Sequence, residues 1–187
     1  MRYRVLLTLV ALTPLMFGIA TVRHTIESSM LLHMMLQFPL LLASGAASAA
    51  LLETASTAWR GAWSVIDHEG LLGLVTLTGV AALWMVPAAL DATLIQSSAA
   101  ALKYISWWFA GFALLLSWRR MSSVLRLFLL GGLAWMFATA GLLFAESEAR
   151  LCVNYRLDEQ AATGAALLAL SGLLVVCLVG SAARRRR

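Results

Sequence analysis

The residue types best suited to chemistry gather in one short stretch, HTIESSMLLHMMLQFP (residues 24–39), which holds two histidines, one glutamate, three methionines and one glutamine. At 100° per residue, five of these side chains fall within an arc of about 120° on a helix. They are Glu27, Met30, His33, Met34 and Gln37. Spacings of three and four residues allow Met30, His33 and Met34 to approach a single point. The pattern predicts a metal site.

Thioether and imidazole ligands together suit Cu(I), a soft ion, and a carboxylate at the mouth of the site suits capture of an arriving cation. We therefore expect His33, Met34 and Met30 to bind the metal. The residues expected at the mouth or around these ligands are Glu27, His24 and Asp91. The alternative interpretation is packing, because methionine fills gaps in apolar cores and a membrane histidine often hydrogen-bonds to a neighbouring helix.

The composition predicts an all-α, polytopic membrane helical bundle that forms a single integral membrane domain over residues 1–187. The chain is 61% hydrophobic and only 12% charged, with a mean hydropathy of +0.86. Its charges lie in small groups between apolar runs close to the roughly 20 residues that a membrane-spanning helix needs. We expect six transmembrane helices, at about 5–22, 29–52, 70–90, 93–118, 124–145 and 160–180. A signal peptide that is cleaved after the first apolar run remains the alternative for that run.

The distribution of arginine predicts the orientation. If six spans alternate, ten arginines fall on one side: Arg2, Arg4, Arg60, Arg119, Arg120, Arg126 and Arg184–Arg187. The positive-inside rule then places both termini in the cytoplasm and the 24–39 stretch at the outer face. We expect a multi-pass protein of the bacterial plasma (inner) membrane, with the lipid bilayer as the partner of the terminal arginines and with no nucleic-acid partner.

Several residues have specific structural expectations. Lys103 lies inside the fourth span, and we expect its side chain to extend to the membrane surface. Pro39 frees the carbonyl of Met35 and is expected to bend the second span. Asp91 and Asp158 each precede an apolar run and are expected to cap a helix N-terminus. Gly131 and Gly132 predict close helix packing.

Enzymes and electron carriers fit the sequence poorly. A haem b carrier needs two axial ligands at similar depth, whereas His68 is expected on the side opposite His24 and His33. The ionisable residues lie mainly at helix ends, and no Gly-x-Ser-x-Gly element occurs, so we expect no catalytic activity.

Three segments carry a resemblance to a known family. ESSMLLHMMLQFPLLLASGA (27–46), LWMVPAALDATL (83–94) and YRLDEQAATGAALL (155–168) resemble parts of the CtaG family of cytochrome c oxidase assembly membrane proteins. The matching positions are His33, Met34, Gln37, Pro39, Pro87, Asp91, Asp158, Gln160 and Gly164. The resemblance implies a copper-linked role in maturing a membrane metalloenzyme.

Two functions remain open from the sequence. The first is a non-catalytic copper-binding chaperone at the outer membrane face, which assists assembly or metallation of a membrane metalloenzyme such as cytochrome c oxidase. The second is an accessory subunit of a larger membrane complex, in which the polar side chains of the 24–39 stretch form hydrogen bonds between helices and bind no metal.

Overall fold

The computed structural model describes residues 2–55, 58–67 and 69–185, and these residues form helices without any strand. The helices are α1 (Arg2–Ala11), α2 (Thr13–Met16), α3 (Ala20–Glu27), α4 (Met30–Leu32), the π-helical turn η1 (His33–Gln37), α5 (Phe38–Ala55), α6 (Ala58–Ile66), α7 (Leu71–Trp84), α8 (Pro87–Ile95), α9 (Ser97–Trp118), α10 (Ser123–Glu146) and α11 (Leu157–Arg185). His68 and the side chains of Arg60 and Arg184–Arg187, which the sequence analysis used, lie outside the described residues.

Four helical segments in the described ranges are long and apolar enough to cross a membrane. They are Met30–Ala55, Ser97–Trp118, Ser123–Glu146 and Leu157–Gly180, and they correspond to the second, fourth, fifth and sixth expected spans. Helices α7 and α8 are together apolar enough to cross a membrane but meet at an angle of 77°. If they count as one broken span, they provide a fifth candidate crossing. The chain is therefore an all-helical protein with four to five candidate membrane spans.

The first expected span, 5–22, is not one continuous helix. Helix α1 ends at Ala11, α2 covers only Thr13–Met16, and the backbone is extended at Ile19 before α3 begins. Pro14 occupies the first turn of α2, where its missing N–H does no harm. The residues described here therefore do not confirm a six-span count.

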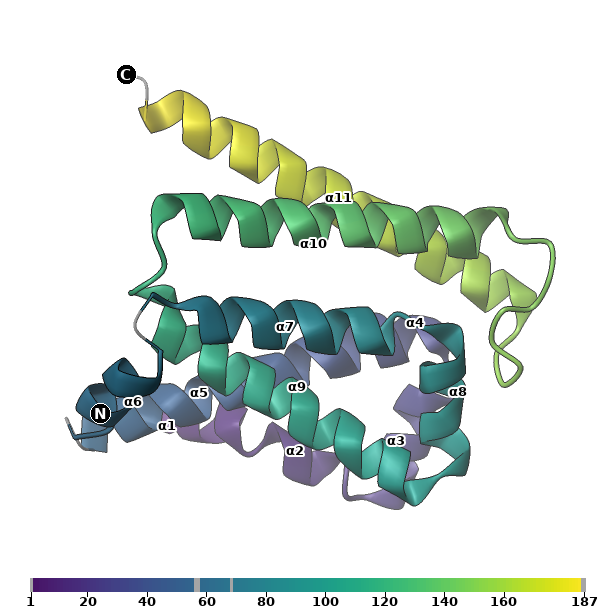
Figure 1. Cartoon of the computed structure of the whole chain (residues 1–187). Helices are drawn as coiled ribbons and strands as arrows, with labels where there is room; N and C mark the ends of the chain where they lie inside the picture. Colours follow the sequence, from purple (N-terminus) through teal and green to yellow (C-terminus); the bar gives the residue numbers. More distant parts are fainter. Residues whose placement is uncertain (1, 56–57, 68, 186–187) are drawn as a thin grey trace.

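Helix α9 packs between α5 and α7 to form one layer, and α10 and α11 form a hairpin on one side of this layer (Figure 1). The closest approach within the layer is between α5 and α9. A Cβ atom added to Gly45 would overlap the carbonyl of Trp108, and one added to Gly111 would overlap the carbonyl of Leu42. Glycine allows these two backbones to touch, which is how small residues act in membrane helix pairs.

The expectation of close packing at Gly131 and Gly132 is wrong, because an added Cβ at either position would have no neighbour within 4 Å among the described residues beyond the adjacent backbone of its own helix. In the α10–α11 hairpin the close contact lies instead at Gly141 and Gly164. The added Cβ of Gly164 would come within 2.7 Å of the carbonyl oxygen of Gly141. Only the facing helix determines which glycines of an apolar helix are packed.

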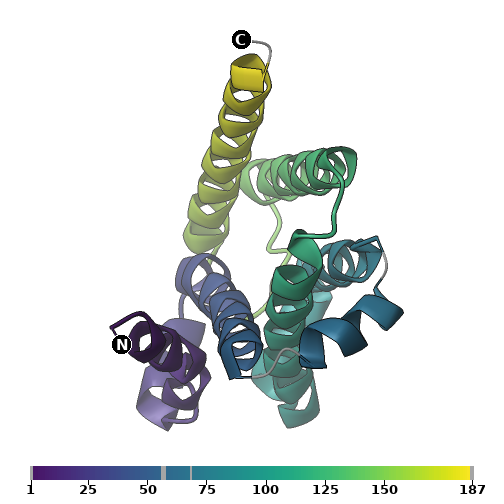
Figure 2. The ribbon, with the colours of Figure 1, turned by 90° about the vertical axis from the view of Figure 1, so that its left-hand side faces the viewer.

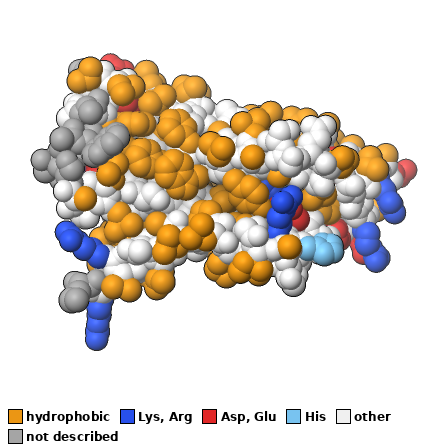
Figure 3. All heavy atoms as spheres, turned by 90° about the horizontal axis from the view of Figure 1, so that it is seen from below, with side chains coloured by type: hydrophobic (Ala, Val, Ile, Leu, Met, Phe, Trp, Pro, Cys, Tyr) orange, Lys and Arg blue, Asp and Glu red, His pale blue; other side chains and the backbone are white. Residues whose placement is uncertain are grey.

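The start of α1 and the end of α11 lie at the same end of the bundle, the left-hand end in Figure 1. Figure 2 shows the bundle from this end, with the C-terminal part of α11 extending beyond the other helices. The opposite end contains α3, α4, α8 and the loop 147–156, and we call it the loop end. On the face shown in Figure 3, charged side chains gather mostly towards the two ends and hydrophobic ones lie between them. This distribution suits a molecule whose middle lies in lipid.

Candidate functional site

The predicted second span begins with an irregular backbone. Ser29 is extended, with φ −113° and ψ 125°, so α3 and α4 are separate helices. The next five residues, His33–Gln37, form the π-helical turn η1 instead of regular α-helix. Pro39 cannot donate a backbone hydrogen bond to Met35, and the helical ladder is widened directly before it. Such π-helical turns are frequent at functional sites.

Lys103 is the centre of a buried polar cluster at the loop end. Its Nζ lies 2.7 Å from Oε1 of Glu27, 2.8 Å from Nε2 of His33 and 3.0 Å from Oε1 of Gln37. The Lys103 side chain is fully buried, so the expectation that it extends to the surface is wrong. An ammonium group has three protons and no acceptor, and here each proton meets one acceptor. We call Glu27, His33, Gln37 and Lys103 the Lys103 cluster.

Glu27 links the cluster to the exterior. Its Oε1 accepts further hydrogen bonds from Tyr104 and Gln37, and its Oε2 accepts one from Nε of Arg23 at 2.9 Å. Burial alone would raise the pKa of the Glu27 carboxyl, but the hydrogen bond and charge of Lys103, together with the Arg23 and Tyr104 hydrogen bonds, lower it to about 2. Glu27 is therefore an anion at neutral pH.

Both ring nitrogens of His33 are engaged. Nδ1 lies 2.6 Å from the hydroxyl oxygen of Tyr155, which belongs to the loop 147–156. Because Lys103 donates to Nε2, the proton of a neutral ring is on Nδ1 and is donated to Tyr155. The rings of His33 and Phe38 also form a T-shaped pair, with centroids 5.3 Å apart. His33 is thus held between α9 and the loop.

The two thioether side chains predicted as ligands have apolar surroundings. Met34 lines an apolar cavity together with Phe38 and Trp107, and Met30 belongs to the hydrophobic core. His24 is exposed on α3. In the described part of the chain, no three side chains of histidine, cysteine, aspartate or glutamate are grouped to hold a metal. The donors that meet at Lys103 Nζ are instead one imidazole nitrogen and two oxygens.

Asp91 has a different role from the expected helix cap. It lies within α8, whose N-cap is Val86. Its carboxylate accepts hydrogen bonds from the backbone N–H of Val153 at 2.7 Å and from the backbone and side chain of Asn154. Asp91 therefore fastens the loop 147–156 to α8. This loop in turn supplies Tyr155 to His33.

Gln160 fixes the other end of the same loop. It is buried, and its Oε1 accepts a hydrogen bond from the Leu151 N–H at 2.9 Å, while its Nε2 donates to the Phe144 and Ala149 carbonyls. Asp158 is the second residue of α11 and forms an exposed ion pair with Arg156. The three segments that carry the family resemblance thus meet at the loop end.

Cys152 is buried in the loop, and its Sγ donates a weak hydrogen bond to the Pro87 carbonyl at 3.9 Å. Burial, with a smaller contribution from the Asp91 carboxylate, raises the pKa of the Cys152 thiol to about 12. Since the thiolate is the form that binds metal, Cys152 is a packing residue at neutral pH. Cys177 is exposed, and both cysteines are free.

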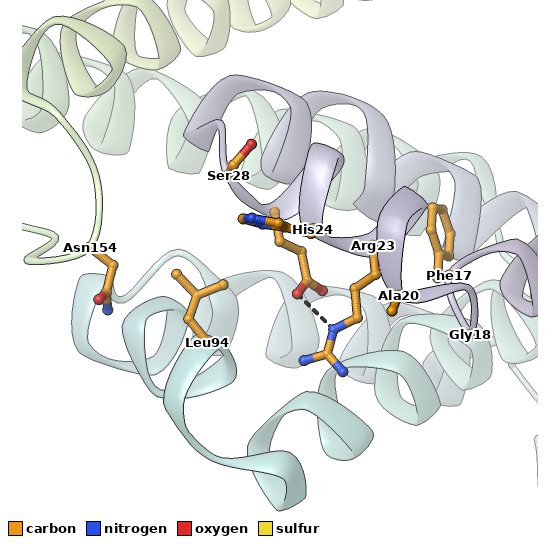
Figure 4. A pocket seen from close by; sticks show the side chains of 9 residues that line it. Phe17, Gly18, Ala20, Arg23, His24, Ser28, Leu94 and Asn154 are labelled. Atoms are coloured by element: carbon orange, nitrogen blue, oxygen red, sulfur yellow. Dashed lines mark hydrogen bonds and ion pairs between the residues drawn. The ribbon is translucent and has the colours of Figure 1, made fainter.

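An open pocket with a volume of about 670 Å³ leads from the exterior to Glu27. Arg23, His24 and Ser28 of the α3 segment line one side, and Leu94 and Asn154 line the opposite side (Figure 4). The dashed contact in Figure 4 is the ion pair between Arg23 and Glu27. Glu27 is the member of the Lys103 cluster that lines this pocket, and its Oε1 lies 2.7 Å from Lys103 Nζ.

The sequence analysis grouped Glu27, His33 and Gln37 on one face but missed Lys103, Tyr104, Tyr155 and Arg23. One signal for Lys103 was available: an ionisable residue within an apolar span usually faces a partner or a functional site. Tyr155 carried no such signal, because its position depends on how the loop folds back over α8. Comparison of the chain with protein-family models, curated proteins and solved structures gives no match.

Proposed function

We propose that this chain is a non-catalytic membrane protein that handles a metal cation, copper foremost, at the loop end, and so assists assembly or metallation of a membrane metalloenzyme such as cytochrome c oxidase. One observation carries the proposal. The Glu27 carboxylate, the His33 imidazole and the Gln37 amide direct three electron-pair donors at one point, and that point is filled by the protein's own cation, the Lys103 ammonium.

Binding of an external cation then requires that Lys103 leave this point or lose its proton. The pocket beside Arg23 and Glu27 gives access from the exterior. His33 Nε2 is the ligand expected to hold copper, since imidazole suits this metal, and Glu27 is the group that meets the ion on entry. The resemblance to the CtaG family supports the same proposal, because the matching residues His33 and Gln37 both belong to the cluster.

The proposal includes the orientation of the protein in the membrane. We place the loop end at the outer face of a bacterial plasma membrane and both termini in the cytoplasm, because arginines lie in the first turn of α1, directly after α9 and at the end of the sequence. The expected partners are the client metalloenzyme and the surrounding lipid.

The experiment is Cu(I) stoichiometry on detergent-purified protein, with a competing chelator to set the affinity scale. We expect about one copper per chain in the wild type, its loss in His33→Ala, and its retention in Met34→Ala, since Met34 faces another cavity. Lys103→Met should bind copper more tightly because the competing ammonium is gone. Cys177→Ser is the matched control for binding by an exposed thiol. Absence of copper, or equal copper in wild type and His33→Ala, would contradict the proposal.

A second candidate is the accessory subunit without a metal. It is favoured by the complete pairing of the Lys103 ammonium, which ties α3, η1 and α9 together as a hydrogen-bond network between helices. Thermal unfolding separates the two candidates. A cation that binds the folded protein raises its melting temperature, whereas an accessory subunit should show the same melting temperature with and without Cu(I), and a lower one in His33→Ala without any metal.

A further inference from the structure

The open pocket beside Glu27 contains part of a guanidinium group that the protein does not engage. Nε of Arg23 donates a hydrogen bond to Oε2 of Glu27 at 2.9 Å. Nη1 and Nη2 of Arg23 have no hydrogen-bond partner in the described part of the chain, and Figure 4 shows both directed away from the carboxylate. The Arg23 side chain is 40% exposed and lines the pocket. Both nitrogens are therefore available to a ligand that enters the pocket.

The charges in contact with Glu27 do not balance. Its Oε1 accepts a hydrogen bond from the Lys103 ammonium and its Oε2 accepts one from Arg23, so two cations share one carboxylate. Asp91 binds the side chain of Asn154, which lines the pocket, but Asp91 itself is not among the described residues that line it. A negatively charged ligand beside Arg23 restores the balance. A phosphate group fits this position, since the planar fork of a guanidinium commonly binds phosphate oxygens through two parallel hydrogen bonds.

The remaining wall of the pocket suits a ligand that is also apolar in part. The pocket has a volume of about 670 Å³, which lies within the roughly 300–1,000 Å³ of sites that enclose small ligands. Phe17 and Leu94 give it apolar surface, and His24 adds an imidazole beside Arg23 (Figure 4). A pocket with a basic side and an apolar side favours an amphiphile over a simple inorganic anion.

The pocket lies at the depth of phospholipid head groups. The candidate span Met30–Ala55 begins shortly after Arg23 and Glu27, and the candidate span Ser97–Trp118 begins shortly after Leu94. These lining residues therefore lie just outside the hydrocarbon core, in the interfacial layer that contains the polar groups of the lipids.

Apolar side chains next to the pocket are strongly exposed. Ile19, Ile95 and Val153 each adjoin a lining residue in the sequence, and the exposed fractions of these three residues are 56%, 74% and 78%. Exposed apolar groups that gather in this way mark a contact with another protein or with a membrane. At this depth the neighbouring molecules are lipids, so a lipid is the amphiphile with direct access to the pocket.

We propose that this pocket binds the phosphate group of an anionic membrane phospholipid, with Nη1 and Nη2 of Arg23 donating hydrogen bonds to two phosphate oxygens. Phosphate binding here does not require copper, and its test contains none, so the failure of either proposal leaves the other standing. The two are related in one respect. A phosphate bound to Arg23 offsets the positive charge at the entrance and so lessens the repulsion of an arriving cation.

The test is native mass spectrometry of the full-length protein, purified in detergent, with dioctanoyl phosphatidylglycerol as the probe. We expect saturable binding to the wild type. Dioctanoyl phosphatidylcholine should bind more weakly, because its choline cation cancels the charge of the phosphate. Arg23→Gln removes the guanidinium fork and should weaken phosphatidylglycerol binding by at least about tenfold, since hydrogen bonds to charged groups are the strong ones.

A second variant leaves the Arg23–Glu27 ion pair in place. Ala20 is exposed and lines the pocket, so Ala20→Trp fills the pocket with an indole ring without changing the core, and it should abolish binding. Arg156→Gln is the matched control. Nε of Arg156 also pairs with a carboxylate, that of Asp158 at 3.0 Å, but Arg156 is not among the residues that line this pocket, so the variant should bind lipid as the wild type does.

Inorganic phosphate is the second probe, and it separates a lipid from a free anion. Binding of inorganic phosphate that depends on Arg23, without binding of phosphatidylglycerol, would show an anion site open to water and would overturn a lipid as the ligand. Equal phosphatidylglycerol binding in wild type, Arg23→Gln and Ala20→Trp would overturn the site. Phosphatidylcholine bound as tightly as phosphatidylglycerol would overturn the preference for an anionic lipid.

Discussion

Nζ of Lys103 lies 2.7 Å from the carboxylate of Glu27 and 2.8 Å from the imidazole of His33, although 76 and 70 residues separate these positions in the chain. The contact joins α9 to α3 and to the π-helical turn η1. It places a paired positive and negative charge in the buried interior of the bundle. Each charge is stable in the interior only while the other is present, so the stability of the protein should depend on the two residues jointly.

Removal of one partner of the Lys103–Glu27 pair should be more harmful than removal of both. Lys103→Met leaves the buried Glu27 carboxylate without its main cation, and breaking a buried pair in this way costs about 3–5 kcal/mol. The double variant Lys103→Met/Glu27→Leu should recover part of that loss. Thermal unfolding in detergent measures the difference. A double variant less stable than Lys103→Met would contradict the pairing.

Acid should destabilise the protein through Glu27. Its pKa in the folded protein is about 2, below the ordinary value of 4.5, so the ionised carboxylate stabilises the fold above pH 4.5. This contribution is lost as the pH falls from 4.5 through 2. The melting temperature of the wild type should therefore fall over this range more than that of Glu27→Gln. Parallel pH profiles of the two proteins would argue against the ion pair.

Loss of the Asp91 carboxylate should release the loop 147–156. Asp91→Ala removes the acceptor for the Val153 and Asn154 backbone N–H groups, and these two amides should exchange hydrogen faster. Because the loop carries Tyr155, release should also weaken its contact with His33. Hydrogen exchange by mass spectrometry gives the measurement. Asp158→Ala is the matched control, since this carboxylate is exposed and pairs with Arg156 at the start of α11, and it should leave the loop protected.

The glycines of the bundle should differ in their tolerance of alanine. Gly45→Ala and Gly111→Ala place a methyl group against the backbone of the facing helix, so each should lower the melting temperature by separating α5 from α9. Gly131→Ala and Gly132→Ala meet open space and replace glycine by a better helix former, so they should be neutral or stabilising. Equal effects at the two pairs would contradict the described packing.

The sequence predicted the membrane character and the positions of several spans because both depend on local composition. Long apolar runs can be satisfied in lipid only as helices, and this holds whatever the neighbours are. The second, fourth, fifth and sixth expected spans therefore appear as long helices. The first did not, since Pro14, Gly18 and the extended Ile19 interrupt a run that is apolar throughout.

The membership of the candidate site was only partly predictable. A helical wheel placed Glu27, His33 and Gln37 on one face, and these three do meet. It also placed Met30 and Met34 there, because it assumed a regular helix from Glu27 onward. The extended Ser29 and the π-helical turn change the angles between these side chains from those of a regular helix, and Met34 lines the apolar cavity.

The sequence by itself determined that this chain is helical, with several apolar segments long enough to cross a membrane and with Glu27, His33 and Gln37 on one face at the start of one of these segments. Tertiary structure alone decided that Lys103 points inward to Glu27 and that Tyr155 reaches His33. The physical reason is that hydropathy depends on each residue and its neighbours in sequence, whereas a buried charge is stable only where packing brings an opposite charge and acceptors to it. That arrangement arises from contacts between α3, η1, α9 and the loop 147–156, which no local pattern encodes.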